Sequence, residues 1–294
     1  MQAATSEGEA YAKVGNGLID AHKADAVAMG RPLGRIGNLE VRLASSDKEV
    51  AAAQEVRYRV FYEELGARKD ASQTECSDAD RFDHICDHLI VLDTSLPGAA
   101  HRRIVGTYRL LRQEQAVASG GFYSESEFEL PELVARHPDK RFLELGRSCV
   151  LPDYRSRRTI EVLWQGIWAY VNHYDIGVMT GCASFHGTAP AAHAEALAYL
   201  AHHCRTEEAW DVRAVAGRYH AMDLMPANDI NAKAAIGAMP PLIKGYLRVG
   251  ARIGDGCVID HEFSTVDVFV VLPVKQIAER YVSYYGAEAQ RFAA

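Results

Sequence analysis

Residues 142–158 read FLELGRSCVLPDYRSRR and run directly into a second apolar stretch. Residues 142–151 predict a β-strand, and residues 158–173 predict an α-helix. A basic turn between a strand and a helix N-terminus suits an anion, because unpaired backbone N–H groups and the helix dipole favour negative charge and arginine adds paired donors. The turn therefore predicts a phosphate site, and an ordinary strand-turn-helix with a solvated basic turn is the equally weighted alternative.

Strand and helix patterns also alternate on both sides of this stretch. Apolar runs predict further strands at residues 38–44, 88–92, 104–111, 176–184 and 266–274. Helical spacing, caps and prolines predict helices at residues 46–65, 190–203, 240–249 and 275–285, with a short helix beginning at Pro131. Helices that return repeatedly to a mixed, mostly antiparallel sheet predict an α/β (α+β) fold.

Composition narrows the classes of function. The net charge of -7 argues against a nucleic-acid-binding protein, because such a protein needs a surplus of Lys and Arg. The N-terminus lacks the pattern of a signal peptide, and no apolar run approaches the roughly 18 residues that span a bilayer. Six scattered cysteines without a CxxC pair predict reduced, buried thiols, and we expect no metal site.

The strand, basic turn and helix of residues 142–173 resemble the acyl-donor motif of the GNAT superfamily of N-acyltransferases. In that motif the strand holds a pantetheine arm and the turn holds a pyrophosphate. The usual turn glycines are replaced here by Ser156, Arg158 and Thr159. The resemblance therefore implies a donor with one phosphate, phosphopantetheine on acyl carrier protein rather than coenzyme A, bound by Cys149, Leu151, Arg155, Arg157 and Arg158.

Four further motifs occur in a fixed order: RYRVF at 57–61, DADRFD at 78–83, TYRLL at 107–111 and ELGR at 144–147. Their order and spacing are similar to those of the acyl-homoserine-lactone synthases, which are GNAT-like and use acyl carrier protein. One family aromatic is absent, because Ala67 stands in its place. The resemblance implies site roles for Arg57, Phe61, Asp78, Asp80, Asp83, Arg109, Glu144 and Arg147.

The C-terminal half carries a third group of motifs: CASFHGTAP at 182–190, PPLIKGYLRVG at 240–250 and DHEFSTVDVF at 260–269. These resemble the ornithine-lipid N-acyltransferases, which place a 3-hydroxyacyl chain on the α-amine of ornithine to give a lyso-lipid. The resemblance covers residues 38–285 and adds Ser184 to the candidate site. It implies a poorly ordered lead-in at 1–37, a GNAT-like acyl-donor half at 38–205, and a C-terminal half at 206–294 that completes the acceptor side.

Aminolysis of a thioester needs a neutral amine, a base and close placement, but no enzyme nucleophile. Glu144 is the first candidate for the base because it lies in the strand beside the donor site, and a structural Glu paired with an Arg is the alternative. In a regular strand Glu144 and Arg147 face opposite sides. A bulge at Gly146 would turn both toward the cleft; without one, Arg147 ties down the acidic loop.

The three aspartates of residues 78–83 have two interpretations. They bind a cationic amino-acid substrate, or they form an ion-pair network with Arg57, Arg109 and Arg147, and the network is favoured because buried charges persist when each is paired. Residues 260–262 (Asp-His-Glu) are a second acidic locus.

Together these patterns predict an acyl-carrier-protein-dependent ornithine N-acyltransferase with no tightly bound cofactor. We expect a cytoplasmic protein with peripheral contact at the inner membrane surface. The alternatives are an N-acyl synthase for another amino acid, a signal synthase acting on S-adenosylmethionine, and a non-catalytic protein that binds acyl carrier protein. The intact Arg57, Arg109, Glu144 and Arg147 argue against a non-catalytic scaffold, and the long C-terminal half argues against a signal synthase.

Overall fold

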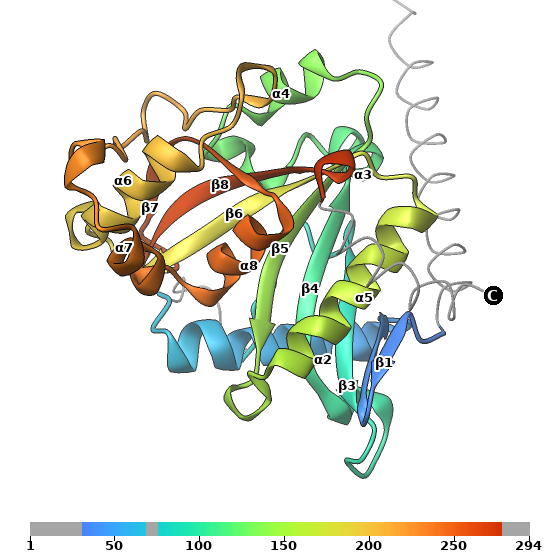
Figure 1. Cartoon of the computed structure of the whole chain (residues 1–294). Helices are drawn as coiled ribbons and strands as arrows, with labels where there is room; N and C mark the ends of the chain where they lie inside the picture. The colour runs from blue at the N-terminus through green and yellow to red at the C-terminus, as the bar shows by residue number, and fades with distance from the viewer. Residues whose placement is uncertain (1–30, 69–75, 278–294) are drawn as a thin grey trace, which may run out of the picture.

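The computed structural model describes residues 31–68 and 76–277, and its centre is an eight-stranded sheet (Figure 1). The strand order is β1-β2-β3-β4-β5-β6-β8-β7. β5 and β6 are parallel, and the other neighbouring pairs are antiparallel. The strands are β1 (Gly34–Ile36), β2 (Leu39–Leu43), β3 (Asp87–Asp93), β4 (Ile104–Arg112), β5 (Phe142–Val150), β6 (Val178–His186), β7 (Arg252–Asp260) and β8 (Thr265–Pro273).

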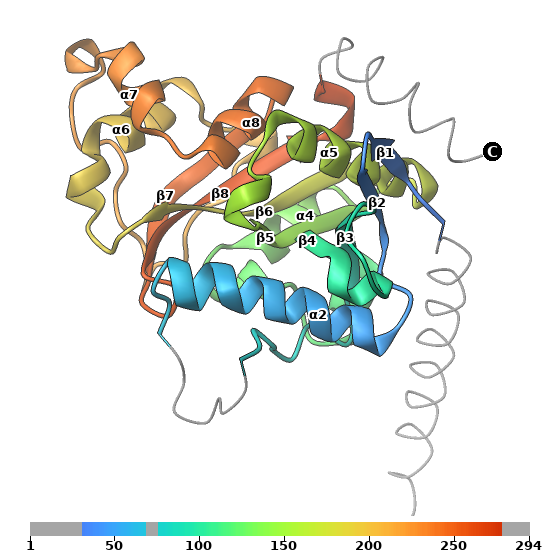
Figure 2. The ribbon, with the colours of Figure 1, turned by 90° about the horizontal axis from the view of Figure 1, so that it is seen from below.

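Helix α2 (Asp47–Tyr58) covers one face of the sheet, on the side opposite helix α5 (Figure 2). Its N-cap is Ser46, whose hydroxyl accepts the N–H of Glu49 and so satisfies one of the free donors of the first turn. Ala53 and Val56 pack against buried residues of β3 and β4. The helix continues as a π-helix over Arg59–Glu64, which carries the chain to the edge of the site described below.

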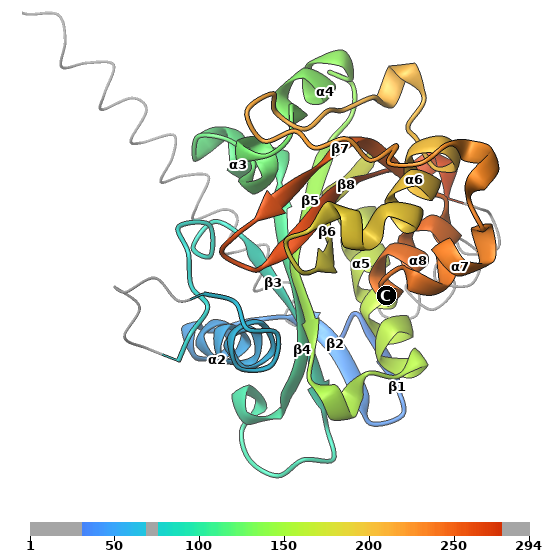
Figure 3. The ribbon, with the colours of Figure 1, turned by 90° about the vertical axis from the view of Figure 1, so that its left-hand side faces the viewer.

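Helices α5 (Arg157–His173), α6 (Ala194–His203), α7 (Ala232–Ala238) and α8 (Pro241–Val249) lie on the other face (Figure 3). Val162, Ile167 and Val171 of α5 are buried there, and burial of each such side chain contributes about 1.5–3 kcal/mol. A Cβ at Gly166 would lie 2.7 Å from a methyl carbon of Val41, so this glycine permits the close approach of α5 to β2. The close packing fixes the start of α5, where the basic turn is.

Two short helices complete the described chain, α3 (Gln113–Ala118) and α4 (Leu130–Arg136). Within the described residues, no helix combines the length and the apolar character needed to cross a bilayer. All six cysteines are free thiols, but the prediction that all are buried is wrong for Cys76, which is exposed, and for Cys182, which is half-buried.

The predicted mixed sheet with flanking helices is confirmed, and the differences are local. Residues 34–36, inside the predicted lead-in, form β1. Strand β7 and helices α3 and α7 were not predicted. The sheet runs through both predicted halves, because β7 and β8 join β6. The predicted helix at 275–285 falls largely outside the described residues, and residues 274–276 form a single 3-10 turn.

Candidate active site

The candidate site is a cavity of about 260 Å³ at the point where β5 and β6 separate. The two strands pair only at Phe142–Val178, Leu143–Met179 and Glu144–Thr180, although both continue for six more residues. The opening is lined by residues from β4, β5, β6, the β7–β8 hairpin and helix α8. A slot between two diverging parallel strands leaves backbone groups of both strands free to contact an extended ligand.

A β-bulge directs β5 into this cavity. Thr107 of β4 pairs with Cys149, whereas Arg109 pairs with Gly146, so Arg147 and Ser148 together lie opposite one residue of β4. Arg147 has a left-handed backbone with φ of 49°, a conformation that costs a non-glycine residue roughly 1 kcal/mol or more. The bulge is therefore centred on Arg147 rather than on Gly146, and Glu144 and Arg147 both line the cavity.

Glu144 is held by backbone donors. Its Oε2 accepts the N–H of Tyr123 at 2.8 Å, and its Oε1 accepts the N–H of Ser124 at 2.9 Å. Burial raises the pKa of this carboxyl, and the two N–H donors partly oppose that rise. The structural alternative of a Glu paired with an Arg is thus not the arrangement present. A buried carboxyl with a raised pKa at a cavity wall has the properties of a general base.

Three aspartates and three arginines form a compact network beside the cavity. Arg57 is fully buried and donates to Asp78 at 2.7 Å and to Asp83 at 2.6 Å. Arg109 donates to Asp80 at 2.7 Å. Arg147 lies 3.1 Å from Asp80 and 3.2 Å from Asp78. Each aspartate is paired with at least one arginine, so the three negative and three positive charges of the network balance. These ion pairs fix the C-terminal end of α2 against β4 and β5.

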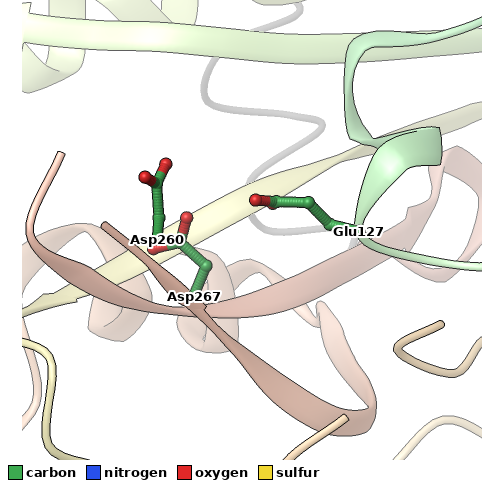
Figure 4. A group of neighbouring side chains, drawn as sticks. All are labelled: Glu127, Asp260 and Asp267. Atoms are coloured by element: carbon green, nitrogen blue, oxygen red, sulfur yellow. The ribbon is translucent and has the colours of Figure 1, made fainter. Parts of the chain in front are cut away.

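Three carboxylates form a second cluster, and two of them, Asp260 and Asp267, line the cavity. Glu127, Asp260 and Asp267 converge from the segment before α4, the end of β7 and the start of β8, and their oxygens lie within 4.8 Å of one another (Figure 4). We call Glu127, Asp260 and Asp267 the acidic trio. Burial, with the neighbouring Asp267, raises the pKa of Glu127 to about 7, and burial raises the pKa of Asp267 to about 6.

One cation contacts the acidic trio directly. Arg218 Nη2 lies 3.0 Å from Glu127 Oε1 and also donates to the carbonyl of Ile259. The Cys182 thiol of β6 donates to Glu127 Oε2 at 3.4 Å. With three carboxylates and one arginine, the acidic trio differs from the balanced network across the cavity.

The family model of the acetyltransferase (GNAT) domain matches residues 56–165, which run from the last turn of α2 through the bulged strand and the basic turn into α5. An L-ornithine N(alpha)-acyltransferase of Brucella abortus is 61% identical over 261 residues, 88% of this chain and 93% of the relative. Another, of Agrobacterium fabrum, is 58% identical over 88% of each chain. This chain belongs to the L-ornithine N(alpha)-acyltransferase family.

Solved structures give only a distant likeness to this acyltransferase. An N-acyl amino acid synthase from uncultured soil microbes has a TM-score of 0.46 at 11% identity, covering 83% of this chain and 97% of that one. An acyl-homoserine-lactone synthase, LasI, has a TM-score of 0.44 at 13% identity, covering 84% of this chain and 94% of that one.

In this acyltransferase, the other predicted site residues fall into two groups. Phe61 and Ser184 line the cavity, and the Phe61 ring contacts that of Phe263 edge-on. Cys149 instead points into the core beneath α2, where burial raises the pKa of its thiol to about 12. Leu151 is half-buried against the same core. Contact between a donor and Cys149 would therefore involve its backbone and not its thiol.

The basic turn of the acyltransferase lies at the N-terminus of α5. Ser156 caps this 17-residue helix by accepting the N–H of Thr159 at 3.3 Å. Arg155 forms a two-pronged ion pair with Glu64, with both distances 2.6 Å. Arg157 pairs with Glu161 but its side chain is 90% exposed, and Arg158 is also exposed. Arg157 and Arg158 are thus the arginines of the turn most accessible to a macromolecule.

The sequence analysis missed Glu127 and Asp267, although it noted Asp260. Asp267 had a detectable signal, since it is the one charged residue in the apolar run VDVFVV of residues 266–271. Glu127 had none, because it lies more than 130 residues from Asp260 and only the fold brings it to the cavity.

Proposed function

We propose that this protein transfers a 3-hydroxyacyl group from acyl carrier protein to the α-amine of ornithine, giving a lyso-ornithine lipid. The observation that carries the proposal is the match to named L-ornithine N(alpha)-acyltransferases over 88% of the chain. A cavity between the diverging β5 and β6, with Glu144 and Arg147 in its wall, supports acyl transfer as the chemistry.

In the proposed reaction, the neutral α-amine attacks the thioester carbonyl carbon, the new C–N bond forms, and the C–S bond breaks to release the carrier-protein thiol. Glu144 accepts the proton that the amine loses, directly or through a water molecule, and a proton returns to the departing sulfur. Both Glu144 oxygens keep a free lone pair beside the N–H bonds that they accept. The amine titrates near roughly 8 in model peptides, so its deprotonation at pH 7 costs only about 1–2 kcal/mol.

Glu144→Gln tests the base. The variant should lose most of kcat while the KM values for both substrates stay within about threefold, and its residual rate should rise with pH toward roughly 8 as the amine deprotonates by itself. The amide group of the glutamine would point one N–H at a backbone N–H, so we expect the free energy of unfolding to fall by about 1–3 kcal/mol. The assays should therefore be run well below the Tm of the variant. Unchanged kcat would place the base elsewhere.

Acyl carrier protein is the proposed donor because the turn carries Arg157 and Arg158 in a chain of net charge -7 and lacks the glycines of a pyrophosphate loop. Acyl carrier proteins are acidic, so exposed arginines beside the cavity would steer them. Purified protein should consume 3-hydroxyacyl carrier protein and ignore the matching acyl-coenzyme A. Equal rates with the two donors would overturn this part of the proposal.

Charge reversal of the turn gives a second test. Arg157→Glu with Arg158→Glu should raise the KM for the acylated carrier protein about tenfold, or about 1.4 kcal/mol, and leave the KM for ornithine unchanged. Lys233→Glu, at an exposed position of α7, is the control and should change neither KM. If the double variant raises the ornithine KM instead, these arginines lie at the acceptor side.

Because the product is amphiphilic, we propose that the protein is cytoplasmic and makes a peripheral contact with the surface of the inner membrane. A high-salt wash of isolated membranes should release the protein, since a surface contact through charge is screened. Retention after the wash would contradict a loose peripheral contact.

A further inference from the structure

The acidic trio is unbalanced in a way that calls for a cation. Asp267 is 6% exposed, and its Oδ1 has no hydrogen-bond partner of normal geometry among residues 31–68 and 76–277. The hydroxyls of Ser184 and Thr265 favour its ionised form, and the same carboxylate lines the cavity. A buried acceptor without a donor costs about 1–3 kcal/mol unless a ligand satisfies it.

The remaining oxygens of the acidic trio point to a ligand with several N–H donors. Asp260 Oδ1 already accepts the backbone N–H groups of Glu262 and Phe263, and Glu127 Oε1 already faces Arg218. A ligand can therefore use Asp267 Oδ1, the second oxygen of Asp260, and Glu127 Oε2, to which the weak Cys182 thiol donates. A primary ammonium presents three N–H donors in a compact group and matches three converging acceptors.

The position of the acidic trio relative to Glu144 fits an acceptor with two amines. Glu144 pairs with Thr180 of β6, and Cys182, two residues further along β6, contacts Glu127 at 3.4 Å. Two residues of a strand span roughly 6.6 Å, a distance that the five-bond chain between the two nitrogens of ornithine can bridge. An α-amine at Glu144 therefore leaves a side-chain ammonium at the acidic trio.

We propose that Glu127, Asp260 and Asp267 form the subsite that binds the side-chain ammonium of a diamino-acid acceptor and so selects it over neutral amino acids. This inference rests on the proposed function for the identity of the acceptor. A divalent metal is disfavoured, because the guanidinium of Arg218 lies 3.0 Å from Glu127 and its positive charge would repel the ion.

The test compares ornithine with 2-aminopentanoate, which is ornithine without its terminal amine. Asp267→Asn should raise the ornithine KM at least tenfold and change kcat/KM for 2-aminopentanoate by less than threefold, so the preference of the wild type for ornithine should collapse. Glu127→Gln should act in the same direction and serves if Asp267→Asn does not fold. Asp139→Asn, at a position that is 70% exposed and does not line the cavity, is the control and should keep the wild-type preference.

Calorimetric titration with the same two amino acids separates this inference from the proposed function. Tighter binding of ornithine than of 2-aminopentanoate, lost in Asp267→Asn, supports the subsite even if no acyl transfer occurs, in which case the proposed function fails alone. If Asp267→Asn and Glu127→Gln both keep the wild-type preference for ornithine over 2-aminopentanoate, the subsite is overturned. Acyl transfer by the wild type would still uphold the proposed function in that case. Loss of ornithine binding on treatment with EDTA, restored by Mg²⁺ or Ca²⁺, would make the acidic trio a metal site and overturn the inference.

Discussion

The two walls of the cavity use the same charged groups in different balance. On one wall Arg57, Arg109 and Arg147 neutralise three aspartates, so every charge has a protein partner. In the acidic trio three carboxylates face a single arginine of the described residues, Arg218. A balanced buried network stabilises geometry, whereas an unbalanced one retains unsatisfied attraction that a ligand can use.

The pKa values of Asp83 in the balanced network and of Asp267 in the acidic trio reflect this difference in charge balance. Burial alone would raise the pKa of Asp83, but the guanidinium groups of Arg57 and Arg109 outweigh it and hold that pKa well below its usual range. In the acidic trio burial dominates, and the pKa of Asp267 rises to about 6. Asp83 is therefore ionised at any physiological pH, while Glu127 and Asp267 titrate near neutrality.

The largest expected effect comes from breaking the balanced network. Arg57→Met keeps most of the side-chain volume but leaves Asp78 and Asp83 buried without their main cation, and we expect the free energy of unfolding to fall by about 3–5 kcal/mol. Urea denaturation at pH 7 measures it, with the exposed Arg102→Met as control. A loss below about 1 kcal/mol would mean that the remaining arginines suffice.

Removing a charge from the acidic trio should instead increase the free energy of unfolding. At pH 8 the folded protein holds Asp267 ionised against its raised pKa, so Asp267→Asn should increase the free energy of unfolding by on the order of 2 kcal/mol. The contribution of Asp267 to wild-type stability should fall as pH rises from 3.8 through about 6, because the folded state binds the Asp267 proton more tightly than the unfolded state does. Asp267→Asn should flatten that slope in denaturation series at several pH values, and a destabilised variant would contradict the imbalance.

Acceptor binding should depend on pH through the acidic trio. Ionisation of Asp267 and Glu127, with pKa values of about 6 and about 7, should lower the ornithine Kd as pH rises from 5.5 to 8, by about fivefold or ~1 kcal/mol. Over this range Arg147 stays cationic and burial keeps the Cys182 thiol protonated.

The measurement is the ratio of the ornithine Kd to the 2-aminopentanoate Kd at each pH. Titration of the α-amine affects both ligands and cancels in this ratio. A ratio that stays constant between pH 5.5 and 8 would show that the acidic trio does not contact the ligand.

The sequence predicted the balanced cluster better than the unbalanced one for a physical reason. Arg57 and the aspartates of residues 78–83 lie close in the chain and in motifs of fixed order. The acidic trio depends on tertiary contacts: the β7–β8 hairpin pairs Asp260 with Thr265, and a bridge between Phe128 and Ala214 brings Glu127 to the cavity. No local pattern records such contacts.

The fold shows the same limit. Strand β8, with its long apolar run, was predicted to within one residue at each end, and so was β5 despite its bulge at Arg147. Strand β7 reads RIGDGCVID, in which Gly254 and Gly256 interrupt the alternation and the register with β8 shifts between Ile253 and Cys257. The two glycines together with the bulge leave β7 without a recognisable period-two signal. The π-helix at 59–64 also has no distinctive sequence signature, because it differs from an α-helix only in its hydrogen-bond spacing.

The smallest expected effect concerns an ion pair that is balanced but not buried. Arg35 pairs with Glu40 on the β1–β2 hairpin, and the Arg35 side chain is 52% exposed. Because water already solvates that charge, Arg35→Gln should lower the free energy of unfolding by less than about 1 kcal/mol, and 0.5 M salt should reduce the difference further. Urea denaturation at two salt concentrations measures both quantities, with Arg57→Met run in parallel. If burial sets the cost of unpairing, the Arg57→Met loss should hardly change with salt. A loss above about 2 kcal/mol for Arg35→Gln would contradict that rule and remove the ground for treating the two walls of the cavity differently.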